Sequence, residues 1–342
     1  MILIDSHCNI DLDALAKTHF QELINPQNQD GSYHATQSLI GRISSQMKVD
    51  ILVPVRIKFW NYFLINHYRN LDRITSGRPE ILAEVIIEIE NLVGHNILSN
   101  NLNYNQASLT SFGKIVKSVF GYEIYRDNGS ARENVEQFNL NYCPYCNKQE
   151  LESIQRTDNL SGNTRITALY QLDHFYPRAR FPYLAVSFFN LIPGCSPCNA
   201  QLKLDKDFNI FTHVNPFHKS FDDYFKFKLS KVVVSSLNEV ELEIENKSPH
   251  SDNSIIDFQL LQRYNNQNTK KRILDQLYAL KNRSEAVRKS YMSQITGLFR
   301  KADIPNEVLL KSQGVPTKKD EISNYPMGKM KRDICIQLDL LK

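Results

Sequence analysis

Four of the six cysteines stand in two C-x2-C pairs, Cys143 with Cys146 and Cys195 with Cys198. This spacing bends the chain back so that both sulfurs can face one metal ion, each at about 2.3 Å from zinc. Because a structural zinc site needs four ligands, we expect the pairs to meet across the 48 residues that separate them. The sequence therefore predicts a four-cysteine structural Zn2+ site. Four packed thiols without a metal are the alternative.

A strand–strand–helix pattern accompanies the cysteine pairs. Residues 166–172 have strand composition and end at Asp173-His174, and residues 188–193 form a second predicted strand that leads into the second pair. A helix should follow, with Ser196 as its N-cap and Pro197 at its first position. This pattern predicts a ββα-metal arrangement. On its own, an Asp-His dipeptide at a strand end more simply indicates a capped loop.

The rest of the chain is predicted to be mainly helical. Apolar residues recur at helical intervals over 9–25, 36–70, 81–89, 112–122, 131–138 and from 255 toward 299. Residues 232–244 alternate as in a β-hairpin, and residues 96–111, rich in Asn and Ser, indicate a loop. We therefore expect an α+β protein with three regions. These are a mainly helical N-terminal region (1–135), an embedded zinc-stapled ββα-metal module (136–212) and a C-terminal region of a hairpin and basic helices (213–342).

The charge distribution is asymmetric. Residues 262–342 contain 17 Lys and Arg against 8 Asp and Glu, within a net charge of +4 for the chain. Such a segment suits a polyanionic partner, and it suits helices with a solvated basic face equally well. No signal peptide or apolar run near 18 residues is present. Paired cysteines in so long a chain indicate metal binding in a reducing compartment. We therefore expect a cytoplasmic protein outside the membrane, with Cys8 and Cys335 as free thiols.

Taken together, the motifs resemble the HNH endonuclease family. The resemblance covers residues 142–203 and rests on C-x2-C, Leu-Asp-His, Asn-Leu-Ile-Pro, C-x2-C-Asn and a following Lys. Cys-Pro-Tyr-Cys with Leu-Asp-His-Phe-Tyr-Pro is most similar to the nuclease subunits of Septu-type anti-phage systems and their retron-associated relatives. The resemblance implies a metal-dependent nuclease that hydrolyses phosphodiester bonds of DNA as the effector of a bacterial defence system.

The resemblance also implies a role for each motif residue. His174 would be the general base that takes a proton from the attacking water. Asp173 and Asn199 would bind a catalytic Mg2+ or Mn2+, since oxygen ligands suit such cations. Asn190 would hold the loop that carries the base. With only two protein ligands, the cation keeps positions for water and a phosphate oxygen.

Several basic residues near the motif have two interpretations. Lys203, Arg178 and Arg180 would contact substrate phosphates and position a duplex without reading its sequence, or they are surface charges. His213 and His218, just after the module, either orient the metal site from outside or lie in an ordinary turn.

The partners follow from the same resemblance. It implies nucleic acid as substrate and an ATPase subunit as regulator. The chain has no G-x4-G-K-[ST] phosphate loop, so ATP dependence would come from that partner. Two alternatives stay open: the same nuclease acting on RNA, and a zinc-stapled nucleic-acid or protein-binding adaptor without catalysis.

Overall fold

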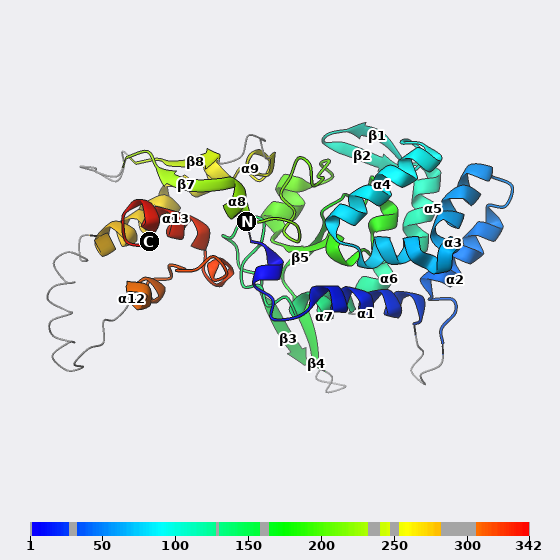
Figure 1. Ribbon diagram of the computed structural model, residues 1–342, viewed down its shortest axis with the longest axis horizontal. Helices are drawn as coiled ribbons and strands as arrows, with labels where there is room; N and C mark the ends of the chain where they lie inside the picture. The colour runs from blue at the N-terminus through cyan, green and yellow to red at the C-terminus, as the bar shows by residue number, and fades with distance from the viewer. Residues whose placement is uncertain are drawn as a thin grey trace. The chain divides into compact units, whose positions relative to one another are not determined.

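The computed structural model describes residues 2–26, 33–127, 130–157, 164–231, 240–246, 253–281 and 306–341 (Figure 1). Helices dominate, and the described strands pair in four two-stranded antiparallel sheets. The α+β class predicted from the sequence is confirmed. Contacts within the chain group it into two compact units. We call them the helical unit (Ile4–Asn139 and Glu152–Lys219) and the C-terminal unit (Met1–Leu3, Leu140–Leu151 and Ser220–Lys342).

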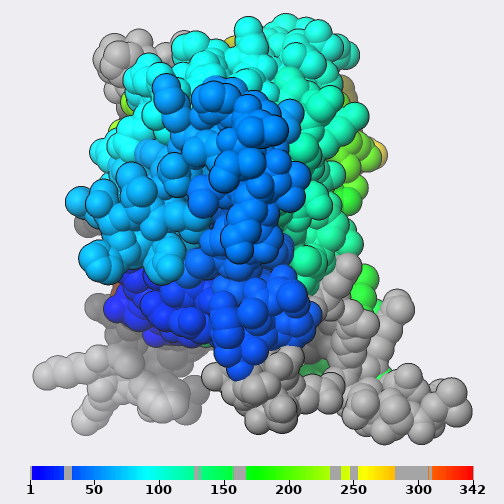
Figure 2. Space-filling view, turned by 90° about the vertical axis from the view of Figure 1, so that its right-hand side faces the viewer, coloured from blue at the N-terminus to red at the C-terminus, as the bar shows by residue number. Residues whose placement is uncertain are grey.

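The helical unit contains most of the described elements. They are, in chain order, η1 (Ile4–Ser6), α1 (Leu12–Ile24), α2 (Leu39–Val49), α3 (Pro54–Ser76), α4 (Pro79–Val93), β1 (Ser99–Asn103), β2 (Gln106–Leu109), α5 (Ser111–Phe120), α6 (Tyr122–Asp127), α7 (Ser130–Glu136), β3 (Ser153–Thr157), β4 (Thr164–Ala168), β5 (Gln171–His174), η2 (Pro182–Leu184), η3 (Phe188–Asn190), β6 (Leu191–Gly194) and η4 (Pro197–Lys203). Figure 2 shows the face that α2, α3 and α4 form on this unit, in blue to cyan.

Aromatic side chains on α3 form the core of this unit. Phe59, Trp60 and Phe63 are fully buried, and Phe59 and Trp60 both meet Phe112 of α5 edge-to-face. Such pairs contribute about 0.5–1.5 kcal/mol beyond the apolar area they bury. The Trp60 indole donates a 2.8 Å hydrogen bond to Asp50, which follows the last residue of α2. Helices α2, α3 and α5 are therefore fixed to one another.

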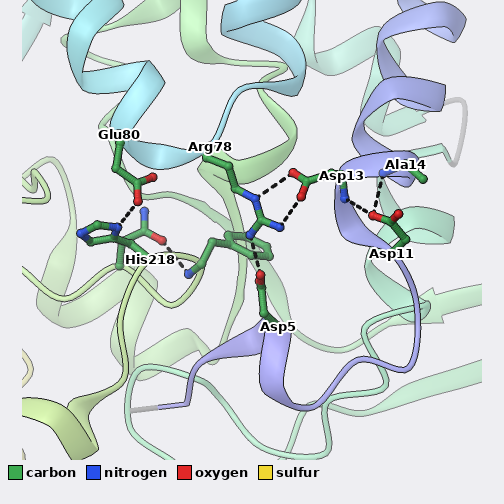
Figure 3. A network of polar contacts seen from close by, with 9 residues as sticks. Asp5, Asp11, Asp13, Ala14, Arg78, Glu80 and His218 are labelled. Atoms are coloured by element: carbon green, nitrogen blue, oxygen red, sulfur yellow. Dashed lines mark hydrogen bonds and ion pairs between the residues drawn. The ribbon is translucent and has the colours of Figure 1, made fainter.

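The start of α4 is tied to the N-terminal segment by Arg78 (Figure 3). Its guanidinium donates to Asp5 at 2.6 Å and to both carboxylate oxygens of Asp13 at 2.8 Å. It also lies over the Phe189 ring, 4.4 Å from the centroid. Two residues further along, Glu80 hydrogen-bonds the His218 ring. This network connects η1, α1 and α4 to Phe189, the residue before Asn190. It also holds the His218 ring against Glu80 of α4, which is a structural role.

His19 of α1 should make the helical unit sensitive to acid. The ring is 1% exposed, and its Nε2 donates to the Val186 carbonyl at 2.7 Å. Burial lowers the pKa of His19 to about 4, against the opposing effect of the Val186 hydrogen bond. Because an unfolded histidine has a pKa near 6.5, its contribution to stability is complete above pH 6.5 and is lost as the pH falls toward 4.

We expect the free energy of unfolding to fall by about 3 kcal/mol across this window through His19 alone. His19→Gln keeps a donor for Val186 and removes the titration, so its stability should decline less between pH 7 and 4. Urea unfolding at a series of pH values measures this. Parallel curves for the two proteins would contradict the assignment.

The C-terminal unit contains α8 (Phe221–Tyr224), β7 (Phe225–Leu229), β8 (Leu242–Asn246), α9 (Asn253–Asp257), α10 (Leu260–Tyr264), a helix over 267–281, α12 (Asn306–Ser312), η6 (Ile322–Asn324) and α13 (Gly328–Gln337). Helix α13 packs on β7, and the Asp333 carboxylate accepts from the Phe227 amide at 2.9 Å. The buried Lys329 ammonium pairs with Asp222 at 2.7 Å and Asp333 at 2.9 Å. The charges of Lys329, Asp222 and Asp333 thus compensate one another inside this unit.

The first cysteine pair belongs to the C-terminal unit and is anchored there by its neighbours. The Asn147 amide nitrogen donates to the carbonyls of Ile322 and Tyr325 at 3.1 and 3.2 Å, and its oxygen accepts from the Lys329 amide at 3.1 Å. Tyr264 donates to the Cys146 carbonyl at 2.6 Å. The turn that carries these cysteines is therefore held by residues more than 100 positions away.

Three expectations about local structure need correction or completion. Residues 96–111 are not a loop, because β1 and β2 pair there as a hairpin. The predicted hairpin over 232–244 is described only from residue 240, and β8 pairs with β7. The continuation of the last helix toward residue 299 lies outside the described residues. Among the described helices, none combines the length and apolar character needed to cross a membrane.

Candidate metal centre and nuclease site

The strands β5 and β6 bring the central motif together. They pair antiparallel, with Asp173 opposite Ile192 and His174 opposite Leu191. The predicted first strand is divided, since β4 ends at Ala168 and pairs with β3. The second is shorter than predicted because Phe188–Asn190 forms the 3-10 turn η3. The helix after Pro197 is a π-helix, and the Ser196 side chain makes no capping bond.

The four paired cysteines form one cluster. Their sulfur atoms all lie within 4.8 Å of one another, and all four residues are buried. Four thiolates are the donor set of a structural zinc site, in which zinc–sulfur distances are about 2.3 Å. The donor chemistry and spacing therefore fit a zinc ion, and this cluster could hold one. Cys8 and Cys335 lie outside this cluster. Burial raises the pKa of their thiols to about 11 and 12, which disfavours the thiolate form that binds a metal.

His174 ends β5 with its ring orientation fixed by a backbone bond. Its Nε2 lies 2.9 Å from the Ala185 carbonyl oxygen, which can only accept, so Nε2 carries the proton and Nδ1 is the basic nitrogen. Tyr122 of α6 meets the ring edge-to-face at 4.7 Å. Burial, with smaller effects of Arg178, Lys203 and Lys117, lowers the pKa of His174 to about 3. The imidazole is therefore neutral at pH 7.

Asn190 fixes the chain that follows His174. Its side-chain oxygen accepts from the Tyr176 amide at 2.7 Å, and its nitrogen donates to the carbonyls of Tyr176 and Leu184 at 3.2 and 3.1 Å. The side chain is fully buried. All of these bonds lie within residues 175–190, which we call the base loop. Because Ala185 is part of it, the bonds of Asn190 also hold the acceptor of His174.

Asp173 and Lys203 form a buried ion pair. The Lys203 ammonium lies 3.0 Å from Asp173 Oδ1 and 2.7 Å from the His174 carbonyl oxygen, and the two side chains are 1% and 3% exposed. The ammonium also lies 5.1 Å from the centroid of the Phe208 ring. A divalent cation at Asp173 does not fit this arrangement, because the carboxylate already has a cationic partner.

The remaining predicted site residues are distributed around this pair. Asn199 donates to the Gln171 side chain at 3.0 Å, two residues before Asp173 on β5, so it is not drawn to Asp173 itself. Arg178 binds Glu123 at 3.0 Å and lies over the Tyr122 ring. These contacts place Arg178 beside His174, through Tyr122, and place Asn199 at the opposite end of the short strand.

Arg180 and His213 have packing roles in this geometry. Arg180 is 6% exposed, and its guanidinium binds the Asn103 carbonyl of the β1–β2 hairpin. His213 bonds Tyr104 at 3.0 Å and stacks on Phe208. The phosphate contacts predicted for Arg180 and Lys203 stay predictions, and burial of both side chains favours a structural role. Sequence reasoning missed Tyr122 as a neighbour of His174, because the two residues are 52 positions apart and no motif links them.

These residues define an α+β protein with a buried four-cysteine cluster beside a histidine-bearing β-hairpin. Comparison with known proteins adds no family, since no family model, curated protein or solved structure matches the chain.

Proposed function

We propose that the protein is an endonuclease of the HNH class that hydrolyses phosphodiester bonds of DNA. One observation carries the proposal: a neutral histidine with a fixed tautomer ends β5, and the base loop after it is held by a buried asparagine. A general base needs a free ring nitrogen in a set orientation. The four-cysteine cluster supports the same class, because it matches the structural zinc that the resemblance implies.

The surroundings of His174 suit an anionic substrate. Three cationic side chains act on the ring and help to keep its pKa low: Arg178, Lys203 and Lys117. A phosphate that approaches the part-exposed Arg178 and Lys117 brings negative charge, which favours the protonated imidazole and raises its pKa. The histidine would then become a stronger base only when substrate is present.

The catalytic cation stays a separate part of the proposal. The resemblance implies Mg2+ or Mn2+ held by Asp173 and Asn199, and it would supply charge stabilisation to the reacting phosphate. Since Asp173 is paired with Lys203, cation binding would compete with that ion pair.

Substrate and partner are proposed from the resemblance. DNA is the favoured substrate, and a ββα-metal site that contacts phosphates would also accept RNA. A defence nuclease in the cytoplasm would be restrained by an ATPase subunit. Cleavage of duplex DNA and of structured RNA, each with and without such a partner, would separate these cases.

The test is cleavage of supercoiled plasmid with Mg2+ or Mn2+ and with EDTA. We expect His174→Ala to lower the rate about 10²- to 10⁴-fold, as is typical for loss of a general base. His95→Ala is the matched control, because the His95 side chain is 70% exposed and lies outside the site. Undiminished cleavage by folded His174→Ala protein would contradict the proposal.

The adaptor function is the second candidate, and the Asp173–Lys203 pair favours it. The Lys203 ammonium binds both the Asp173 carboxylate and the His174 carbonyl, so in this alternative the ion pair only stabilises the end of β5. This alternative requires nucleic-acid binding by wild-type protein without cleavage under any metal condition. It also requires unchanged binding by His174→Ala.

A further inference from the structure

The helical unit contains a hollow lined by both polar and apolar groups. It has a volume of about 530 Å³ and is lined by residues of α1, the start of α2 and the segment before it, and the junction of α5 with α6, among them Thr18, His19, Glu22, Gln37, Arg42 and Tyr125. Ligand sites in proteins typically have volumes of about 300–1,000 Å³. None of the residues discussed above as catalytic or metal-binding lines this hollow.

Arg42 brings an uncompensated charge to the hollow. Its Nε and Nη1 atoms are buried and have no hydrogen-bond partner among the described residues. Desolvation alone lowers the pKa of Arg42, with no acidic group acting on it. Gly121, with φ of 56°, allows the close approach, since a Cβ there would lie 2.0 Å from Nη1. A buried donor pair without a partner is costly, and an anion would satisfy it.

His19 supplies a complementary acceptor. Because its Nε2 donates to Val186, its Nδ1 is an unprotonated acceptor, and this buried atom also has no partner among the described residues. Glu22, on the same rim, carries a second acceptor. A ligand that satisfies these side chains therefore needs two kinds of group: an anionic group for Arg42 and hydrogen-bond donors for His19 and Glu22.

The hollow is also connected to the candidate catalytic histidine. His19 binds the carbonyl of Val186, and His174 binds the carbonyl of the adjacent Ala185. The short helix α6 makes a parallel connection. Its Tyr125 ring lies 4.8 Å from His19 and its Tyr122 ring lies 4.7 Å from His174.

We propose that this hollow binds a small organic anion with hydrogen-bond donors, such as a nucleoside monophosphate, and that its occupancy is sensed at His174 through the base loop and α6. The binding site stands apart from the nuclease assignment. Only the sensing rests on the proposed function.

Binding is tested by isothermal titration calorimetry with three probes: AMP, inorganic phosphate and succinate. We expect saturable binding of AMP, with phosphate and succinate separating phosphate from carboxylate recognition. Arg42→Met should weaken binding by about tenfold to a hundredfold, since a charge-assisted hydrogen bond is removed. Arg69→Met, at an exposed position of α3, is the matched control and should bind as wild type. Absence of saturable, Arg42-dependent binding by all three probes overturns the proposal.

Thermal unfolding distinguishes a binding role for Arg42 from a structural one. Without ligand, Arg42→Met replaces an unpaired buried charge by a shorter, apolar chain, so its melting temperature should equal or exceed that of wild type. A structural arginine would give a clear decrease instead.

Sensing has its own readout in the NMR signals of the His174 ring. They should shift on addition of AMP to wild type and stay unchanged in Arg42→Met. If AMP binds without this shift, the proposed sensing at His174 is wrong, and the proposed binding site still stands. Failure of the nuclease assay affects neither measurement.

Discussion

Purified protein will contain one zinc ion per chain, and Cys195→Ser will lose it together with cooperative unfolding. The four sulfurs that lie within 4.8 Å of one another match a closed tetrahedral site. Zinc binding to such sites contributes apparent free energies of about 10–16 kcal/mol in small domains, so this is the largest single effect we expect. Metal content by atomic emission spectroscopy and thermal unfolding with and without a chelator check it.

The matched control for this variant is Cys335→Ser. Cys335 is as buried as the cluster cysteines but lies outside the cluster, so its replacement has the cost of a buried hydroxyl without loss of a ligand. It should retain zinc fully. Zinc-free wild-type protein with unaltered stability would show that the four thiols pack without a metal, the alternative left open by the sequence.

Lys203→Met should lower the free energy of unfolding by about 3–5 kcal/mol, because it leaves the buried Asp173 carboxylate without its partner. It also removes the 2.7 Å bond to the His174 carbonyl, so the end of β5 loses a tie. We therefore expect plasmid cleavage to fall as well. Urea unfolding and the cleavage assay measure the two effects.

A double-mutant cycle isolates the ion pair. Asp173→Asn alone should also destabilise, since it leaves the Lys203 charge unpaired. The double variant should be more stable than the sum of the single changes by about 0.5–3 kcal/mol. Lys114→Met, at an exposed position of α5, is the control and should change stability little. Additive single effects would mean that the two side chains do not stabilise each other.

The four-cysteine cluster and the position of His174 at the end of β5 could be predicted because both depend on local spacing in the sequence. Two residues between paired cysteines define a turn, and the predicted strand places Asp173 and His174 side by side at its end. These features depend on a few neighbouring residues, so one sequence suffices to find them.

The burial and the partners of Lys203 and Arg180 could not be predicted, because they depend on residues distant in the sequence. A lysine four residues after Asn199 resembles a surface charge until Asp173 is known to lie 3.0 Å from its ammonium group. Arg180 is buried only because the β1–β2 hairpin supplies carbonyls from about 75 residues away. That hairpin was itself predicted as a loop, since its Asn-rich strands lack an apolar alternation. Arg42 and His19 left no local signal at all.

The anchoring of the first cysteine turn has a consequence for protein synthesis. Asn147 is bonded to Ile322, 175 positions later in the chain. At translation rates of about 5–20 residues per second, its partners leave the ribosome roughly 10–35 s after the turn itself. Throughout that interval the growing chain carries the Cys143 and Cys146 thiols on a turn that lacks these partners. Nascent protein is therefore most exposed to oxidation and to wrong metals before its last helix is made.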